Sequence, residues 1–254
     1  MATKPRQPEA AALGEGEAAA LAAELDERYG HLPAEEIIAV AIDFFREAGG
    51  IAATSSFGAD SAALLHLIAE ADPDLPVTFL DTGQHFGETL EYRDQLADDL
   101  GLTNIVVIRP LDDALAANDP DGVLHKSDTD GCCAIRKVEP MARAVAPYRA
   151  WFTGRKRGQA ATRADMPVFE AVGPRIRINP LARWTTEDQA AYMVKHDLRQ
   201  NPLVAFGYLS IGCFPCTTPV QPGEDPRSGR WAGQAKTECG IHLPGLEVAL
   251  SPSS

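Results

Sequence analysis

Apolar segments of two different periods alternate along the first half of this chain, and this alternation constrains the fold more than any other feature. Short apolar runs typical of buried strands are each followed by a longer segment with helical spacing. Strands joined by helices lie parallel in one sheet, with the helices packed on its faces. The sequence therefore predicts an α/β fold. The expected strands cover 51–55, 77–81 and 104–108, and the expected helices cover 60–70 and 87–100.

The rest of the chain divides around this core. Two further helical patterns precede it and end at glycines, at Gly30 and at Gly49-Gly50. After it we expect a loop over 111–127, a helix over 132–146, a strand over 150–153 and a capped helix over 185–196. Pro and Gly recur too often after residue 200 for long regular elements. We thus expect a loose N-terminus (1–15), an α/β nucleotide-binding domain (16–200) and a C-terminal segment (201–254) with irregular structure.

The net charge of -13 argues against a protein that grips a nucleic-acid backbone. The basic residues are nevertheless concentrated, because Arg136 to Arg183 holds 11 of the 23 Lys and Arg residues and only three acids. Such a stretch suits a pocket for a small anion, although a solvated charged face explains it too. No apolar stretch approaches the ~20 residues that cross a bilayer. We expect a cytoplasmic protein with neither a membrane nor a nucleic-acid partner.

Small and polar residues follow the first two predicted strands. The first of these turns, SSFGADS at 55–61, leads into a helix, whose N-terminus favours an anion. The second strand ends in Leu80-Asp81-Thr82-Gly83. Ligands of open α/β sheets bind at such carboxyl ends. The pattern favours a nucleotide pocket, and the alternative for the first turn is an ordinary strand–helix connection with Asp60 as the helix N-cap.

Four of the five cysteines form two pairs, Cys132-Cys133 and the C-x-x-C motif of Cys213 and Cys216. Neighbouring cysteines do not readily bond to each other, and on a helix their side chains diverge by roughly 100°. Four thiolates specify zinc or an iron–sulfur cluster. Two buried apolar cysteines at 132 and 133, or a catalytic dithiol at 213 and 216, are the alternatives.

Cys239 stands apart in KTECGIH, close to the C-terminus. A lone thiol next to glycine, with a histidine nearby, has the freedom that a nucleophile needs. Glu238 would disfavour the thiolate, so the fold must supply cations if Cys239 is reactive. The alternative is an inert exposed cysteine.

Together these motifs resemble the assimilatory adenylyl-sulfate (APS) reductases, within the wider family that also includes phosphoadenylyl-sulfate (PAPS) reductases. The resemblance runs from about Ile51 to His242. Its motifs are SSFGADS (55–61), FLDTGQHFGET (79–89), CCAIRK (132–137), WFTGRKRGQAATR (151–163), PLARWTTED (180–188), GCFPCT (212–217), RSGRW (227–231) and KTECGIH (236–242).

The resemblance implies a Rossmann-like parallel sheet of the adenine nucleotide alpha hydrolase type. It also implies thioredoxin-dependent reduction of APS to sulfite and AMP in sulfate assimilation and cysteine biosynthesis. The two cysteine pairs look like those of the branch in which Cys132, Cys133, Cys213 and Cys216 hold a [4Fe-4S] cluster. The resemblance further implies a homo-oligomer, because relatives associate into dimers or tetramers. Phe57 replaces a glycine of the related pyrophosphatase loop, which fits a ligand with one phosphate and one sulfate.

In the implied mechanism Cys239 attacks the sulfur of APS, AMP leaves, and an S-sulfocysteine forms that thioredoxin reduces. Both substrate and leaving group are anionic, so the site needs fixed cations. The expected catalytic residues are Cys239, Lys137 and His242. The expected substrate-binding residues are Ser56, Asp60, Ser61, Arg163, Arg227 and Arg230.

Three alternatives to this function stay open. The first is the same reaction on PAPS, a substrate that differs from APS only near the ribose. An RNA-thiolating enzyme would share the fold, but it would be expected to keep a Gly-Gly loop and a broad basic surface, and this acidic chain shows neither. A zinc-stapled nucleotide-binding regulator would use the four thiolates without turnover.

Overall fold

The computed structural model describes residues 13–48, 50–232, 236, 238 and 240–242. The predicted loose segment 1–15 lies mostly outside these residues, and the first helix begins at Glu15. Within the described ranges, no helix is both long enough and apolar enough to cross a membrane. The helices are α1 (Glu15–Tyr29), α2 (Ala34–Glu47), α3 (Ser61–Ala71), α4 (Gly87–Leu100), α5 (Asp112–Asn118), α6 (Thr129–Cys133), α7 (Glu139–Val145) and α8 (Thr186–Lys195).

The described strands form one six-stranded sheet in the order β3-β2-β1-β4-β6-β5. Every neighbouring pair is parallel except β5 and β6, which are antiparallel. The predicted parallel sheet is thereby confirmed, with one antiparallel edge strand added. The strands are β1 (Ile51–Thr54), β2 (Val77–Leu80), β3 (Ile105–Ile108), β4 (Ala150–Phe152), β5 (Phe169–Val172) and β6 (Arg175–Ile178).

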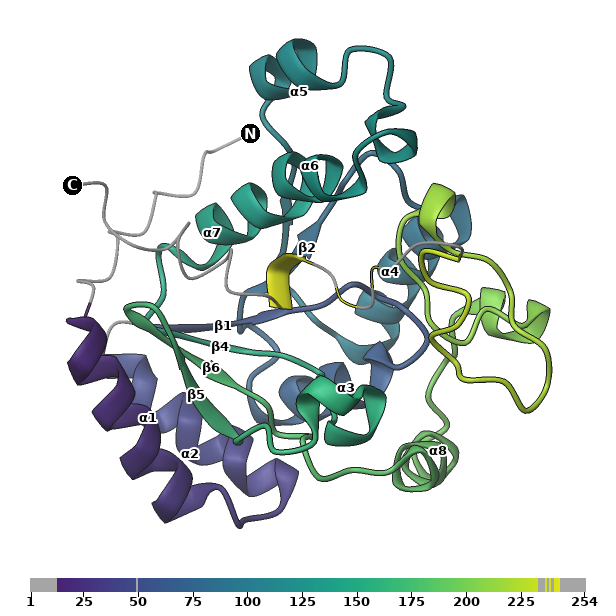
Figure 1. Ribbon diagram of the computed structural model, residues 1–254. Coiled ribbons are helices and arrows are strands. Elements are labelled where there is room, and N and C mark those ends of the chain that lie inside the picture. The colour runs from purple at the N-terminus through teal and green to yellow at the C-terminus, as the bar shows by residue number, and fades with distance from the viewer. Residues whose placement is uncertain (1–12, 49, 233–235, 237, 239, 243–254) are drawn as a thin grey trace.

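Helices cover both faces of this sheet (Figure 1). Helices α1, α2 and α3 lie on one face, where Ile37, Phe45 and Leu65 are fully buried in the main core. Helix α7 lies on the other face and packs Met141 against Trp151 of β4 in a second cluster. Strands enclosed on both faces are mostly apolar, which is why β1 and β2 are apolar apart from one threonine each, Thr54 and Thr78.

The expected helix over 132–146 is present but is not uniform. It begins earlier, as α6, where the Asp128 side chain accepts a hydrogen bond from the Gly131 N–H at 2.8 Å. A π-helical turn over Ala134–Val138 then leads into α7. Pro140 has no N–H to continue the ordinary ladder, and this permits the wider turn.

Two expectations were wrong or incomplete. The segment 111–127, expected as a loop, contains α5 and a 3₁₀ turn over Leu124–Lys126. Asp112 and Asp113 lie in the first turn of α5, where acids favour a helix. The hairpin of β5 and β6 was not expected at all, and its turn includes Gly173 with a φ of 55°.

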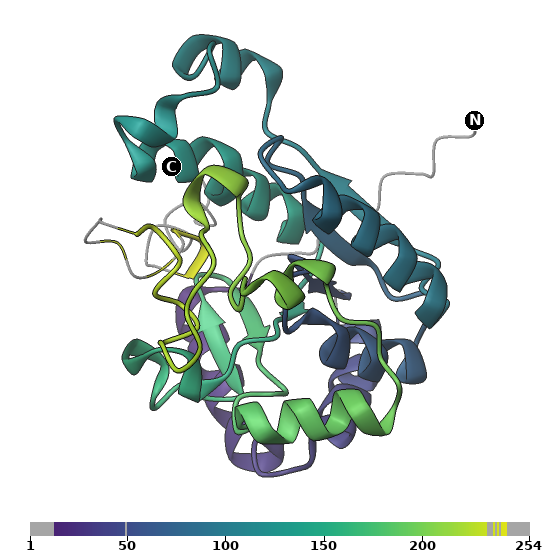
Figure 2. The ribbon, with the colours of Figure 1, turned by 90° about the vertical axis from the view of Figure 1, so that its right-hand side faces the viewer.

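The C-terminal segment after residue 200 contains only 3₁₀ turns and an isolated bridge between Thr217 and Arg230 among the residues described. It lies between α6 and α8 (Figure 2). Its Phe214 N–H donates to the Gln84 carbonyl just after β2, at 2.8 Å. The segment therefore covers the carboxyl edge of the sheet, where a site is expected in this architecture.

Candidate active site

The loop between β1 and α3 is supported from beneath by an aromatic ring. Phe57 has a φ of 48°, a conformation that is uncommon for residues other than glycine. Its ring is fully buried and meets Phe79 edge-on, with centroids 5.8 Å apart. Asn201 donates to the Phe57 carbonyl at 3.0 Å. The bulky side chain thus turns into the core and leaves Ser56 exposed at the loop surface.

Asp60 occupies the N-cap position of α3, but its side chain makes no capping hydrogen bond. Its Oδ2 instead accepts from Lys156 Nζ at 2.7 Å and from Gln159 Nε2 at 3.2 Å. Ser61, the first residue of α3, is half-buried beside it. Asp60 is therefore the N-cap by position, as the alternative expected, but its carboxylate joins the β1 loop to the segment that follows β4.

Two glutamine side chains extend this junction. Gln189 of α8 is buried, donates to the Asp60 carbonyl at 2.8 Å and accepts from Lys156 Nζ. Gln159 accepts from the Lys156 N–H at 3.1 Å and from Arg163 Nη1 at 2.7 Å. The loop after β1 is thereby connected, through Gln159, to Arg163.

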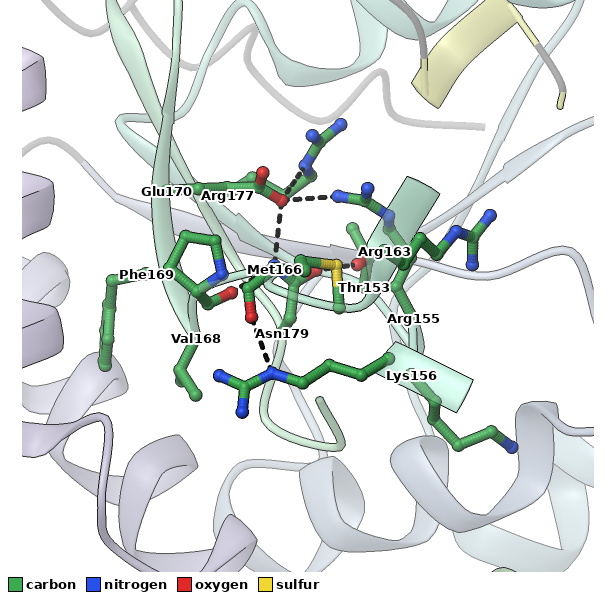
Figure 3. A network of polar contacts seen from close by, with 12 residues as sticks. Thr153, Arg155, Lys156, Arg163, Met166, Val168, Phe169, Glu170, Arg177 and Asn179 are labelled. Carbon is green, nitrogen blue, oxygen red and sulfur yellow. Dashed lines mark hydrogen bonds and ion pairs between the residues drawn. The ribbon is translucent and has the colours of Figure 1, made fainter. Parts of the chain in front are cut away.

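A second polar network is buried at the antiparallel edge of the sheet (Figure 3). Glu170 Oε1 accepts from Arg177 Nε at 2.6 Å, from Asn179 Nδ2 at 2.8 Å and from Arg155. Burial alone would raise the pKa of Glu170, but these hydrogen bonds and the charges of both arginines hold it below its usual value. Burial, together with the charge of Arg177, lowers the pKa of Arg155 to about 10.

Arg163 and Glu238 form a buried ion pair with two hydrogen bonds. Arg163 Nε donates to Oε1 at 2.9 Å and Nη2 donates to Oε2 at 2.8 Å. The side chains of Arg163 and Glu238 are 4% and 5% exposed. Arg227 Nη2 also donates to Glu238 Oε2, at 3.3 Å. Burial lowers the pKa of Arg227, Glu238 opposes that effect, and Arg163 and Arg230 add to it.

These arginines and glutamates interact electrostatically and form one cationic cluster, defined as Arg155, Arg163, Arg177 and Arg227 with Glu170 and Glu238. Its four positive charges outnumber its two negative charges. The Arg155 Nε is buried and has no hydrogen-bond partner among the described residues. Excess positive charge away from water favours the binding of an anion.

The four paired cysteines meet at the boundary between α6 and the C-terminal segment. Cys132, Cys133 and Cys213 are buried, Cys216 is half-buried, and none of the four is joined in a disulfide. Burial raises the pKa of the Cys132 thiol, and the nearby Cys213 and Cys216 raise it further although Arg136 opposes them. No group of three or more Cys, His, Asp or Glu in the described part of the chain has the spacing of a single-ion site.

A buried ion pair anchors the cysteine region to the carboxyl end of β2. Arg136 donates to Asp119 Oδ2 at 2.7 Å and to the Thr82 carbonyl, also at 2.7 Å. The Thr82 hydroxyl lies 3.3 Å from the Cys213 sulfur. These contacts fix the position of the π-helical turn relative to the C-x-x-C motif.

Cations surround the outer cysteine. Burial and the charge of Cys213 raise the pKa of Cys216, whereas Lys137, Arg230 and Lys236 lower it. Arg230 packs against Gly212, where an added Cβ would clash with its guanidinium. Lys137 and Arg230, both expected at the substrate, therefore lie beside the cysteines as well.

Cys239 lies outside the described residues, and so does the side chain of His242. Their neighbours are described. Glu238 belongs to the cationic cluster. Gly240 begins a 3₁₀ turn that lies against the π-helical turn. A Cβ added at Gly240 would lie 2.8 Å from Val138 Cγ2. The residues on both sides of Cys239 are thus packed against the body of the domain.

Residues 50–219 match the model of the phosphoadenosine phosphosulfate reductase domain. This match decides the family, because it spans well over half of the chain. The chain belongs to the phosphoadenosine phosphosulfate reductase family. As a member of that family, it is similar to two curated proteins that are both named adenosine 5'-phosphosulfate reductase. The protein of Chelativorans sp. is 75% identical over 89% of this chain and 93% of its own length. That of Mesorhizobium japonicum is 67% identical over 100% of both chains.

A solved structure of the same family supports the fold. The phosphoadenylyl-sulfate reductase from Candida auris, crystallised as a phosphate complex, matches this reductase-family chain with a TM-score of 0.66 at 27% identity. The match covers 78% of this chain and 96% of that one. The expected α/β architecture is thereby confirmed.

The structure brings four of the expected site residues together in two pairs. Arg163 and Arg227 meet at Glu238, while Lys137 and Arg230 meet at Cys216. Sequence reasoning missed Lys156, Gln159 and Gln189, which hold Asp60. It also missed Arg155 and Arg177. The motif WFTGRKRGQAATR contained the signal for Arg155, Lys156 and Gln159, but only its last arginine was selected.

Proposed function

We propose that this family member is an adenylyl-sulfate reductase, which converts APS to sulfite and AMP with electrons from thioredoxin. The single observation that carries the proposal is the cationic cluster. It has an excess of positive charge and includes Glu238, the residue before Cys239. A substrate with adjoining phosphate and sulfate groups supplies the negative charge that such a cluster lacks. Both curated relatives described above are named adenosine 5'-phosphosulfate reductase.

In the first step the Cys239 thiolate attacks the sulfate sulfur. A bond forms between Sγ and that sulfur, the bond from sulfur to the phosphate oxygen breaks, and AMP leaves with its electron pair. Lys137, Arg163, Arg227 and Arg230 lower the energy of the negative charge on the phosphosulfate, and Ser56, Asp60 and Ser61 line the nucleotide end. His242 assists at the reacting end.

In the second step a thioredoxin thiolate attacks the Cys239 sulfur of the S-sulfocysteine. Sulfite leaves with the electron pair of the sulfur–sulfur bond, and a mixed disulfide forms. The second thioredoxin thiol then breaks that disulfide, which restores Cys239 and leaves thioredoxin oxidised. Two electrons are thereby transferred from thioredoxin to the sulfur that departs as sulfite.

Cys132, Cys133, Cys213 and Cys216 would hold a [4Fe-4S] cluster. Four buried or half-buried thiols on two segments supply the soft donors that such a group needs. A cluster of several atoms is wider than one ion, so its ligands stand farther apart than those of a single-ion site. When bound, it would tune the electrostatics of the site without carrying electrons. The charges of Lys137, Arg230 and Lys236 act on Cys216 and would balance the negative charge of the thiolates that hold the cluster.

The test is sulfite release by protein purified without oxygen, assayed with thioredoxin and with either APS or PAPS. The proposal predicts release from APS, and loss of release in Cys239→Ser. Efficient release from PAPS instead would favour PAPS as the substrate. The family description and the name of the Candida auris enzyme both refer to PAPS. No release from either would overturn the proposal. A cytoplasmic location and a homo-oligomer remain predictions.

A further inference from the structure

The Glu238 carboxylate, which directly precedes the proposed nucleophile in the sequence, is buried in an ion pair. Both of its oxygens accept hydrogen bonds from Arg163, in the parallel geometry that gives arginine–carboxylate pairs their strength. Its side chain is 5% exposed, so water does not screen the pair. A buried pair of this kind strongly resists the removal of one partner.

The clamp on Glu238 is continuous with the nucleotide loop. Arg163 Nη1 donates to Gln159 Oε1 at 2.7 Å, and Gln159 Nε2 donates to Asp60 Oδ2 at 3.2 Å. Asp60 directly precedes α3 in the loop after β1. The residue before Cys239 is thus joined to the loop proposed for the nucleotide through two side chains.

A second anchor lies on the other side of Cys239. Gly240 approaches the Val138 side chain so closely that a Cβ would stand 2.8 Å from it. Val138 ends the π-helical turn that follows Cys132 and Cys133. The two neighbours of Cys239 are therefore held by different elements, one at the cationic cluster and the other at the cysteine region.

We propose that Glu238 is a positioning residue that latches the Cys239 segment into the active site by occupying part of the substrate's own anion site. Arg163 provides the latch. Arg227, whose contact with Glu238 is longer at 3.3 Å and whose side chain is 21% exposed, directs its charge to the incoming phosphosulfate in this proposal. The latch thus resolves the apparent conflict of an acid beside a thiolate, because arginines neutralise Glu238.

The inference rests on the proposed function in that it takes Cys239 as the nucleophile. It predicts a combination that a merely structural role would not give. In Glu238→Gln the segment should be released, which slows transfer of the sulfonate to Cys239. The same change removes a competing anion from the arginines, so AMP should bind several-fold more tightly. Loss of local structure alone would slow sulfonate transfer and would also weaken AMP binding.

The experiment compares the intact, cluster-containing wild type with Glu238→Gln and with Asp99→Asn. The control breaks the Arg199–Asp99 pair, whose side chains are 46% and 42% exposed and which lies outside the cationic cluster. Hydrogen exchange of peptides covering 236–242 and the rate of Cys239 alkylation by iodoacetamide report release of the segment. Calorimetry with AMP reports the arginines, and single-turnover mass spectrometry with APS reports sulfonate transfer.

We expect Glu238→Gln to raise exchange and alkylation at least about tenfold, to tighten AMP binding and to slow sulfonate transfer. Asp99→Asn should behave as wild type. Unchanged exchange and alkylation in Glu238→Gln, or weaker AMP binding, would overturn the latch. If wild-type Cys239 acquires no sulfonate, the proposed function fails, whereas the exchange and AMP measurements still decide whether Glu238 anchors the segment.

Discussion

Lys156 Nζ lies 2.7 Å from Asp60 Oδ2 and joins the loop after β1 to the segment after β4. The two segments end neighbouring parallel strands, and an open sheet places the ends of such strands side by side. The lysine side chain is 6% exposed, and its Nζ donates to the Asp60 carboxylate and to the side-chain carbonyl of Gln189. The junction holds the proposed nucleotide end in shape before a ligand arrives.

Replacing Lys156 with methionine should therefore weaken both the fold and nucleotide binding. Removing the cation leaves the Gln189 carbonyl without its donor, which costs about 1–3 kcal/mol of unfolding free energy. Urea unfolding and calorimetry with AMP measure the two effects. Arg199→Met removes an exposed cation and should cost less than about 1 kcal/mol. Equal losses in the two variants would contradict the role given to Lys156.

The charge on Glu170 predicts how stability depends on pH. The folded-state pKa of Glu170 is below its ordinary value of 4.5, because Arg177, Asn179 and Arg155 favour the ionised form despite burial. The stabilisation is therefore complete above about pH 4.5 and is lost as pH falls through the lower folded-state pKa. In Glu170→Gln this part of the acid dependence should disappear. Thermal unfolding of both proteins between neutral and acid pH measures it, and parallel curves would refute the assignment.

Gly240 gives a prediction with its own rescue. Gly240→Ala places a methyl group against Val138, which forces the turn away from the π-helical turn. We expect slower sulfonate transfer, with AMP affinity unchanged because the arginines are untouched. Val138→Ala removes the opposing methyl groups, so the double variant should recover most of the lost rate. Failure of that rescue would mean that the contact with Val138 does not position the segment.

We assign the four paired cysteines to a cluster and Cys239 to the reaction itself. Replacing Cys213 or Cys133 with serine should abolish the brown colour, the absorbance near 400 nm typical of iron–sulfur proteins, and most of the bound iron. Cys239→Ser should keep colour and iron and lose only sulfite release. Zinc in the wild-type protein, measured by metal analysis, would favour the structural-zinc alternative.

How much of the fold the sequence predicts depends on whether burial alone determines the element. Strands β1 and β2 are enclosed by helices on both faces, so they are apolar apart from one threonine each, and they were predicted within one residue. Strand β6 was missed because Arg175 and Arg177 alternate along it. Glu170 lies opposite Arg177 in the register of the hairpin, so the strand is stabilised by a charge pair that periodicity does not detect.

The candidate site divides in the same way. Arg163 follows from its motif, but its partner Glu238 is 75 residues away, and no local pattern relates the two. The sequence indicated that cations must lie near Glu238, but it did not identify which ones pair with that carboxylate. Asp60 was expected at the nucleotide end, whereas its link to Lys156 depends on how strands β1 and β4 come to lie side by side.

The central claim is that Cys239 receives the sulfonate of APS. It is tested most directly by mixing the anaerobically purified protein with APS in the absence of thioredoxin, then locating any added mass by peptide mass spectrometry. We expect one sulfonate on the peptide containing Cys239, and we expect it to be removed when thioredoxin is added. A sulfonate on another cysteine, or none on any, would contradict it.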